Sequence, residues 1–351
     1  MRRLFALLLT IFMLLPLFAC GTTPSESQPV ELRPFTDSLG RSVEVPKEIQ
    51  KVAVTGPVAQ LMLFSLCPDQ LVGLATPWDS SAVKYLDRAY LALPLIGQFY
   101  GGKSALNLEA LLCSGAEIIV DVGEDKGDLT KDMDSLQEQA GIPVIHISAT
   151  VETMGDAYRL LGELLNVPEE AEQRAAFWEK SYSRVCDLAA GAEKVRAVYV
   201  TGTDGGSVMA KNSYHSEIFD LLCDNVAVMD YPAVKGTGNE IGMEQLLSWD
   251  PDYIVFAPGG IYAEAAADPA WNTLNAIQSG NYCEAPAGPD NWMGFPPGIQ
   301  RCLGMLWLGK LFYGDAADYD LYTEVKEFYH LFYHCDLTQA QFDALTGNSV
   351  Y

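Results

Sequence analysis

The chain has 351 residues, of which 49% are hydrophobic, and this length and apolar content suffice for two domains with separate cores. Its 46 Asp and Glu residues outnumber its 22 Lys and Arg residues, which gives a formal net charge of −24. This balance excludes nucleic acid as an expected partner, because contacts to phosphate need a basic surface. It also disfavours direct adhesion of the folded body to anionic lipid.

The N-terminal segment is typical of a secreted lipoprotein. Two arginines precede an apolar run at 4–18, which matches the h-region of a signal peptide and is short for a bilayer span of about 20 residues. The run ends in Leu17-Phe18-Ala19-Cys20, which resembles a bacterial lipobox. It therefore predicts residues 1–20 as a signal peptide, with lipidation at Cys20. The alternative is an ordinary signal peptide cut nearby, which the bulk of Phe18 favours.

Residues 21–30 predict a flexible tether, since Val30 is their only large apolar residue. From residue 51, short apolar runs alternate with amphipathic stretches. The pattern predicts helices at 59–66 and 131–140, and strands at 51–55, 71–74, 95–97, 118–122 and 144–147. Strands that are apolar throughout and alternate with helices indicate a parallel sheet covered on both faces. These elements define a first lobe at 31–150.

A long helical region is predicted next, at 151–190. It contains one amphipathic helix at 152–165 and a second at 169–190, which at 1.5 Å per residue is about 33 Å long. The α/β pattern then restarts and predicts a second lobe at 191–351, with strands at 198–201 and 253–257 and helices at 216–223, 302–312 and 319–334. The expected fold is therefore α/β, with two Rossmann-like lobes joined by one long rigid helix. Such a link predicts that the lobes close by only a few degrees on binding.

An internal repeat relates the two lobes. The segment Leu108-Glu109-Ala110-Leu111-Leu112 and the strand that follows it recur 135 residues later, beginning with Met243-Glu244-Gln245-Leu246-Leu247. Each copy is a short helix that opens with a glutamate, then a loop and a buried strand. Two similar lobes joined by a helix leave a cleft between them, and such clefts are common sites for small ligands.

Several further motifs are distributed along the chain. They are the hairpin Phe35-Thr36-Asp37-Ser38-Leu39-Gly40-Arg41-Ser42-Val43-Glu44-Val45-Pro46, the segment LLCDNVA at 221–227, WDPDYI at 249–254, WNTLNAIQSG at 271–280 and a late helix at 303–312. With these motifs the sequence resembles the helix-linked (class III) solute-binding proteins of ABC importers for iron-siderophores, haem or cobalamin. Cys223 and Asp224 depart from the pattern, because they replace two glycines of the family motif.

The resemblance implies an extracytoplasmic, monomeric binder without a cofactor and not an enzyme. It would be held at the cell membrane by its lipid and would deliver a solute to a permease dimer with its ATPase. The resemblance also implies that Glu109 and Glu244 dock the two lobes onto arginines of the permease. The alternative is that both acids satisfy backbone donors at helix N-termini. The sequence has no G-x-S-x-G and no H-E-x-x-H motif that would favour an enzyme.

Ligand contacts are expected in the loops that follow the strands. The candidates are Trp78, Gln98, Tyr100 and Glu124 in the first lobe, and Thr203, Lys211, Tyr262 and Trp292 in the second. The aromatic rings suit a planar chelate. Trp78, Tyr100 and Trp292 are favoured, because large rings in glycine-rich loops are hard to explain as core. The alternative for each residue is ordinary loop packing.

The small numbers of histidines and of basic residues near the candidate loops limit the class of ligand. Four histidines are too few to favour a bare metal ion as cargo, so no metal site is predicted. The basic residues near the candidate loops are few, namely Lys103, Lys211, Lys235 and Arg301, which disfavours an anionic siderophore. A neutral or weakly charged chelate such as cobalamin is favoured. The alternatives are molybdate or tungstate held by backbone amides, or a sensing lipoprotein that is not coupled to import.

The cysteines predict thiols and no disulfide framework. Apart from Cys20, seven of the eight cysteines remain, and they have no paired spacing. Cys67, Cys113, Cys223 and Cys302 lie in apolar helical contexts, where a thiol packs as a small hydrophobic group.

Overall fold

The computed structural model describes residues 30–100, 105–124, 127–233 and 236–349. The predicted signal peptide, the lipidation residue Cys20 and most of the tether lie outside the described residues, as do Lys103 and Lys235. Residues 32–351 form one compact unit, and residues 1–31 are assigned to another. Among the described residues, none of the helices combines the length and the apolar composition needed to cross a bilayer.

The unit begins with an antiparallel hairpin of β1 (Leu32–Thr36) and β2 (Ser42–Pro46). Its turn is organised by Asp37, which is 4% exposed and accepts hydrogen bonds from the backbone N–H groups of Leu39 and Arg41, both at 3.0 Å. The Arg41 guanidinium binds the same carboxylate and donates to the carbonyl oxygen of Val144 at 2.7 Å. The T-D-x-x-G-R motif at residues 36–41 therefore stabilises the turn of the hairpin and attaches the hairpin to the first sheet.

The first lobe contains a parallel sheet in the order β3 (Val52–Val54), β4 (Ile118–Gly123), β5 (Val144–Ser148). Side chains that alternate along its strands enter two different cores. One face packs under α2 (Pro57–Leu66), and the other under α4 (Leu108–Cys113) and α5 (Leu129–Ala140). The predicted strands at 71–74 and 95–97 are wrong, because Leu71, Leu74 and Leu95 form only isolated bridges at the edge of this sheet.

Two helices follow the first sheet, α6 (Met154–Leu165) and α7 (Pro168–Gly191), and the 24 residues of α7 confirm the predicted long helix. The two helices pack as a hairpin. On its surface, Arg159 of α6 forms ion pairs with Glu172 and Glu179 of α7. The remaining short helices of the unit are η1 (Pro68–Gln70), η2 (Ser80–Lys84), α3 (Arg88–Leu91), η3 (Tyr214–Ser216), η4 (Trp271–Thr273) and η5 (Gly314–Ala316).

The second lobe contains a mixed sheet. Its strands are β6 (Arg196–Thr201), β7 (Ser207–Val208), β8 (Asp224–Asn225), β9 (Asn239–Glu240), β10 (Tyr253–Phe256) and β11 (Tyr282–Glu284). The strands β8, β6, β10 and β11 run parallel, whereas β7 and β9 are antiparallel. The expectation of a parallel sheet therefore holds for the centre and is wrong for the β7–β9 edge. The helices of this lobe are α8 (Glu217–Leu222), α9 (Met243–Trp249), α10 (Tyr262–Ala265) and α11 (Asn275–Gln278).

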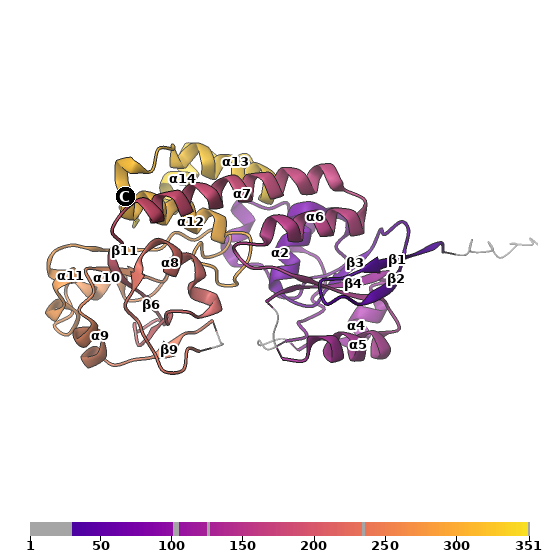
Figure 1. The fold of residues 1–351 in the computed structure, drawn as a ribbon, viewed down its shortest axis with the longest axis horizontal. Helices are drawn as coiled ribbons and strands as arrows, with labels where there is room; N and C mark the ends of the chain where they lie inside the picture. Colours follow the sequence, from indigo (N-terminus) through magenta and orange to yellow (C-terminus); the bar gives the residue numbers. More distant parts are fainter. Residues whose placement is uncertain (1–29, 101–104, 125–126, 234–235, 350–351) are drawn as a thin grey trace, which may run out of the picture. The chain divides into compact units, whose positions relative to one another are not determined.

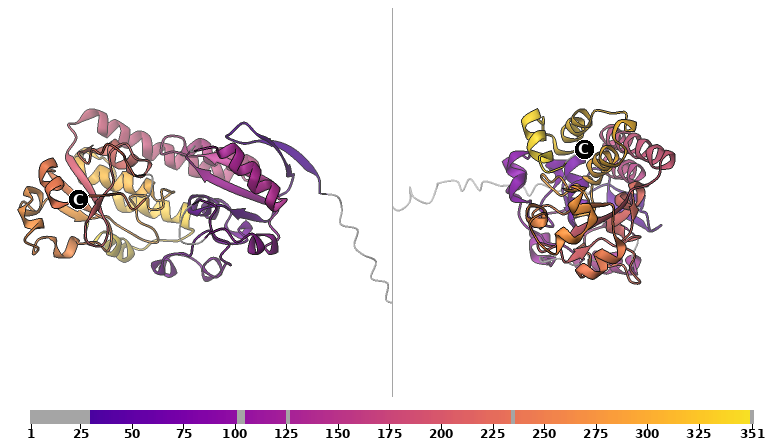
Figure 2. Two further views of the ribbon diagram at one scale, coloured as in Figure 1. Left: turned by 90° about the horizontal axis from the view of Figure 1, so that it is seen from below. Right: turned by 90° about the vertical axis from the view of Figure 1, so that its left-hand side faces the viewer.

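Three C-terminal helices complete the unit, α12 (Arg301–Tyr313), α13 (Leu321–Tyr333) and α14 (Gln339–Thr346). α12 and α13 lie beside α7 (Figures 1 and 2), α14 packs on α13, and α13 also packs on α2 of the first lobe. Arg174 of α7 donates to the carbonyl oxygen of Leu331 at 2.9 Å, which ties α13 to the long helix. The lobes are therefore joined by α7 together with α12 and α13, and not by α7 alone.

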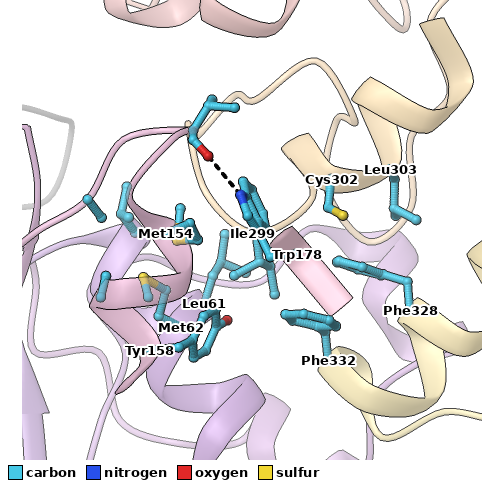
Figure 3. Close-up of a cluster of buried hydrophobic side chains, with 14 of the residues drawn as sticks. Leu61, Met62, Met154, Tyr158, Trp178, Ile299, Cys302, Leu303, Phe328 and Phe332 are labelled. Atoms are coloured by element: carbon cyan, nitrogen blue, oxygen red, sulfur yellow. Dashed lines mark hydrogen bonds between the residues drawn. The ribbon is translucent and has the colours of Figure 1, made fainter. Parts of the chain in front are cut away.

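One apolar core runs beneath these helices and receives side chains from one face of each sheet. Figure 3 shows part of it, where Trp178 of α7 lies among Met62 of α2, Tyr158 of α6 and Phe332 of α13. Separate smaller cores fill the opposite face of each sheet. Because the main core spans both sheets, the packing that stabilises one lobe also stabilises the other.

All seven cysteines of the described residues are free thiols. Cys67, Cys223, Cys283 and Cys302 are buried, whereas Cys113 is exposed at the last turn of α4. The expectation of a packed thiol is therefore wrong for Cys113.

Candidate ligand-binding site

A cavity of about 760 Å³ lies between the first and second lobes. On the first-lobe side it is lined by Glu124, which follows β4, and by residues 150–152, which follow β5. On the second-lobe side it is lined by Asn212, Ser213, Tyr214, Glu217, Asp220 and Leu221, with Tyr182 of α7 and Lys194 beside them. Parallel strands end at the same edge of a sheet, so β4 and β5 bring their following loops together there.

The described residues that line this cavity are mainly acidic, with four carboxylates and one ammonium group. The Asp220 carboxylate is already engaged within the second lobe. It accepts hydrogen bonds from Asn212 N, Ser216 Oγ and Asn225 Nδ2 at 2.7–2.8 Å. The Lys194 ammonium group donates to the carbonyl oxygen of Asp220 at 3.0 Å, so it too is engaged in a hydrogen bond within the second lobe. The other carboxylates of the described lining are those of Glu124, Glu152 and Glu217, and Glu217 is paired with Arg301.

The pKa of the Glu217 carboxyl group is shifted by its surroundings. Burial raises the pKa of its carboxyl group, and the negative charge of Glu124 adds to the effect, whereas the Arg301 guanidinium opposes it. The influence of Glu124 shows that acids from the two lobes approach each other at this cavity. An anionic ligand would meet repulsion here, and a neutral or cationic ligand would not.

Of the eight ligand-binding candidates, the structure places only Glu124 in the wall of this cavity. Gln98 is 9% exposed within the first lobe, and Tyr100 packs edge-on against Phe99 and donates to Asp132 at 2.9 Å. Lys211 lies next to the lining residue Asn212, but its ammonium group is paired with Asp224 at 2.8 Å. These residues lie in the predicted loops without facing the cavity.

Trp78 lies in a different pocket, of about 310 Å³, within the first lobe. That pocket is mainly apolar, with Leu74, Leu91 and Leu93 among its lining residues, and the Trp78 ring packs edge-on against Phe64. The loop around Trp78 therefore folds onto helix α2 of its own lobe and does not reach the interlobe cavity.

Two candidates lie elsewhere in the second lobe. Thr203 is exposed between β6 and β7, and Tyr262 of α10 packs against the rings of Phe256 and Tyr282. In Figure 1, α10 lies on the side of the second lobe that is turned away from the first. Tyr262 therefore packs within the second lobe, on the side away from the first lobe.

Trp292 requires a correction. The prediction treated its ring as a cleft group, but the residue is 0% exposed and belongs to the main core. Its loop passes under α12, and the carbonyl oxygen of Trp292 lies so close to Gly304 that a side chain there would clash. The glycine-rich loop therefore serves close packing and does not present the ring to solvent.

The residues that the sequence reasoning missed include Tyr182, Tyr214 and Glu217. Tyr182 has the helical spacing of a core residue, and residues 214 and 217 lie at the start of a helix that was predicted only for its apolar pattern. Two exposed rings were also missed, Tyr231 at 87% and Phe295 at 51% exposure. A run of polar and aromatic residues at 211–217 was the only signal in the sequence that could have indicated this part of the wall.

The spacing G-x-x-x-x-G-K-S of a phosphate-binding loop occurs at 97–104. Its structural context does not match, since a P-loop leads directly from a strand into a helix. Here Gln98 and Ala105 form an isolated bridge, and α4 begins only at Leu108. Residues 101–104 lie outside the described part of the chain.

The histidines have structural partners. His146 is 1% exposed, and its Nδ1 lies 2.7 Å from a carboxylate oxygen of Asp121, which also accepts a hydrogen bond from the Thr55 hydroxyl. His330 binds Asp336, and His334 binds the carbonyl oxygen of Phe64. Within the described ranges, no group of three or more His, Cys, Asp or Glu residues is placed to hold a metal ion.

Glu109 and Glu244 are both exposed in the first turns of α4 and α9. In α4 the N-terminal donor is satisfied by Asn107, whose side chain accepts from Ala110 N at 3.0 Å. The two helices lie along the same side of the unit in Figure 1, one in each lobe. The repeat detected in the sequence therefore places two equivalent carboxylates on one side of the unit.

The fold is that of solute-binding proteins of ABC transporters. Solved structures with this fold include such a protein from Sulfurospirillum deleyianum, with a TM-score of 0.82, 23% identity and coverage of 90% of this chain and 99% of that one. Another is the molybdate-bound periplasmic binding protein MolA from Haemophilus influenzae, with a TM-score of 0.68, 18% identity and coverage of 87% and 99%. A third is CeuE from Helicobacter pylori in a Ni-His complex, with a TM-score of 0.64, 17% identity and coverage of 90% and 99%.

The sequence comparison agrees with the fold. Residues 118–288 match the periplasmic binding protein family, and no curated protein sequence matches the chain. The matched residues run from β4 of the first lobe to the loop after β11 of the second. The resemblance expected from the sequence is thus confirmed: the chain has the fold of ABC transporter solute-binding proteins, and its middle part matches the periplasmic binding protein family.

Proposed function

We propose that this protein binds a neutral or cationic metal chelate between its lobes and delivers it to the permease of an ABC importer. The chelate would be of the iron-siderophore, haem or cobalamin type, and lipidation at Cys20 would hold the protein at the cell membrane. The observation that carries the proposal is the cavity of about 760 Å³ whose walls come from both lobes. Its volume lies within the range of sites for small organic ligands.

The charge of the cavity supports a chelate over an oxyanion. Molybdate or tungstate would need hydrogen-bond donors or cations, and among the described residues of the lining the only basic side chain is that of Lys194. The ring of Tyr214 in the lining offers apolar surface to an organic chelate. MolA binds molybdate within the same fold, so the oxyanion is the alternative to be tested directly.

A thermal-shift screen of residues 21–351 tests the ligand class. The panel contains cobalamin, haem, several ferric siderophores, nickel with histidine, molybdate and tungstate. A ligand at a hundred times its dissociation constant adds about 2.7 kcal/mol to the free energy of unfolding, which raises the melting temperature by roughly 5 °C or more. A shift with one chelate, reduced in Glu124→Gln, is expected. A shift with molybdate or tungstate alone would contradict the chelate proposal.

The delivery role rests on Glu109 and Glu244, which we propose to pair with basic residues of the permease. Two carboxylates at a fixed separation give a two-point electrostatic contact that orients the protein on its transporter. Reversal of both to arginine is expected to abolish uptake and to leave the ligand-induced shift unchanged. The matched control is Glu163→Arg with Glu169→Arg, which makes the same charge change at exposed positions of α6 and α7.

Uptake that is equally reduced in the control pair would show a general effect of charge, and normal uptake in Glu109→Arg/Glu244→Arg would refute the docking role. A sensing lipoprotein is the second candidate function. It would bind the ligand but show no loss of accumulated solute when the whole protein is deleted.

A further inference from the structure

The two lobes touch through a direct polar contact at the edge of the cavity. Residues 149–153 connect β5 to α6 on the first-lobe side, and they face η3 and the first turn of α8. The Tyr214 hydroxyl donates to the carbonyl oxygen of Ala149 at 3.1 Å. A side chain of the second lobe therefore binds a backbone group of the first.

The second-lobe side of this contact is held in place by Arg301, the first residue of α12. Its side chain is 0% exposed, and its guanidinium donates to the Glu217 carboxylate and to the carbonyl oxygen of Tyr214. The guanidinium also lies 4.6 Å from the centroid of the Tyr214 ring. A buried guanidinium is costly unless it is paired, so Arg301 restricts both Glu217 and Tyr214 to this arrangement.

The first-lobe side is held by the long helix. The indole N–H of Trp178 donates to the carbonyl oxygen of Val151 at 2.8 Å, and Trp178 is itself 0% exposed (Figure 3). Val151 is thus bonded through its carbonyl group to α7. Both sides of the contact rest on the main core, which makes the contact rigid.

We infer that Tyr214 forms an interlobe latch with Ala149, and that the latch sets the width of the cavity before a solute arrives. Arg301 is a positioning residue, because it acts through Tyr214. Tyr214 also lines the cavity, so a solute that bonds to the Tyr214 hydroxyl competes with the latch. The latch rests on contacts of the ligand-free chain and does not depend on the identity of the solute.

The test is hydrogen–deuterium exchange on residues 21–351 without ligand, since residues 32–351 form a compact unit with their own cores. Tyr214→Phe keeps the ring over Arg301 and removes only the hydroxyl group that reaches Ala149. Loss of one such bond is expected to speed exchange in peptides covering 149–153 and 212–217 about fivefold. Exchange in the distant β10 and α11 should stay unchanged.

The matched control is Tyr182→Phe, which removes a hydroxyl group from the same cavity. Tyr182 lies on α7 and lines the same cavity, so this variant measures the effect of removing a hydroxyl group there. This variant should leave exchange at 149–153 as in the unmodified protein. If Tyr214→Phe speeds exchange only at 212–217, or no more than the control does, the hydroxyl is a local contact and the latch is refuted.

Glu217→Gln tests the support of the latch. It keeps the size of the side chain, but it removes the charge that Arg301 binds. Because Arg301 also holds Tyr214, we expect faster exchange at both 149–153 and the first turn of α12. If this variant does not fold, Tyr214→Phe alone decides. Because no ligand is added, a negative result here is separate from a failure of the proposed chelate function.

Discussion

Asp290 is an acid whose surroundings disfavour its charge. Its Oδ2 is buried and has no hydrogen-bond partner among the described residues. Burial raises the pKa of this carboxyl group to about 7, and the charge of Asp79 adds to the effect. The folded state therefore keeps a proton that the unfolded state releases near pH 4, so the free energy of unfolding falls as pH rises from about 4 to 7.

Asp290→Asn should remove this dependence, because the amide cannot ionise. At pH 8 the variant is expected to be more stable than the unmodified protein, by at most about 4 kcal/mol, and at pH 4 the two should be nearly equal. Urea denaturation at both pH values measures the difference. Asp230→Asn, at an exposed position, is the control and should show no change with pH. An equal effect of Asp290→Asn at both pH values would contradict the assignment.

Sequence reasoning placed single residues well where local chemistry decides their position. The first-turn glutamates Glu109 and Glu244 follow from helix N-terminal patterns, and Glu124 from its place after a strand. It failed where burial depends on segments distant in the chain. Trp292 has a glycine-rich local sequence, yet α12 covers it, and nothing near residue 292 indicates that contact.

The α6–α7 hairpin depends on a close approach between its two helices. At Gly162 of α6, an added Cβ would lie 2.4 Å from the Cβ of Ala171 in α7. Neither group can rotate away, so Gly162→Ala must push the helices apart. We expect it to lower the free energy of unfolding by about 1–3 kcal/mol.

Gly191→Ala is the matched control, because it makes the same change at the end of α7, where nothing lies within 4 Å. This variant should be neutral or more stable by up to about 1 kcal/mol. Urea denaturation midpoints of the two variants measure the comparison. Equal midpoints would show that the two helices adjust without cost, and the close approach would then have no role in stability.

The elements that the sequence predicted correctly are those with a strong period or a continuous apolar run. The helix α7 and the strands β4, β5 and β10 belong to this group. The strands β7 and β9 were missed because each has only two residues, too few to show alternation. The predicted strands around residues 72 and 96 are apolar enough, but each makes only single bridges at the sheet edge.

At the scale of the molecule, the sequence predicted two lobes and a long helix but not what joins them. The packing of α13 on α2 brings together residues more than 250 positions apart, as in the bond from His334 to the carbonyl oxygen of Phe64. Such contacts leave no periodic signal. They strengthen the expectation of a closure of only a few degrees, because bending the lobes would have to shear a shared core as well as the helix.

The shared core predicts that both lobes unfold in one transition. Phe332 of α13 is 0% exposed and stacks on Phe328, with Tyr158 of α6 and Phe177 of α7 edge-on to its ring. Phe332→Ala should therefore lower the free energy of unfolding by about 3–5 kcal/mol. Because its contacts support both sheets, the loss should shift the entire transition and leave its shape unchanged.

Scanning calorimetry of residues 21–351 measures this, with a calorimetric to van't Hoff enthalpy ratio near 1 expected for both proteins. Ile277→Ala, in the smaller core of the second lobe, is the comparison, because its side chain contacts only that core. If the lobes were independent, Ile277→Ala would split the transition by lowering the melting of the second lobe alone. A single transition that moves as one in both variants requires that the main core couples the two sheets, so that a solute bound by either lobe stabilises both.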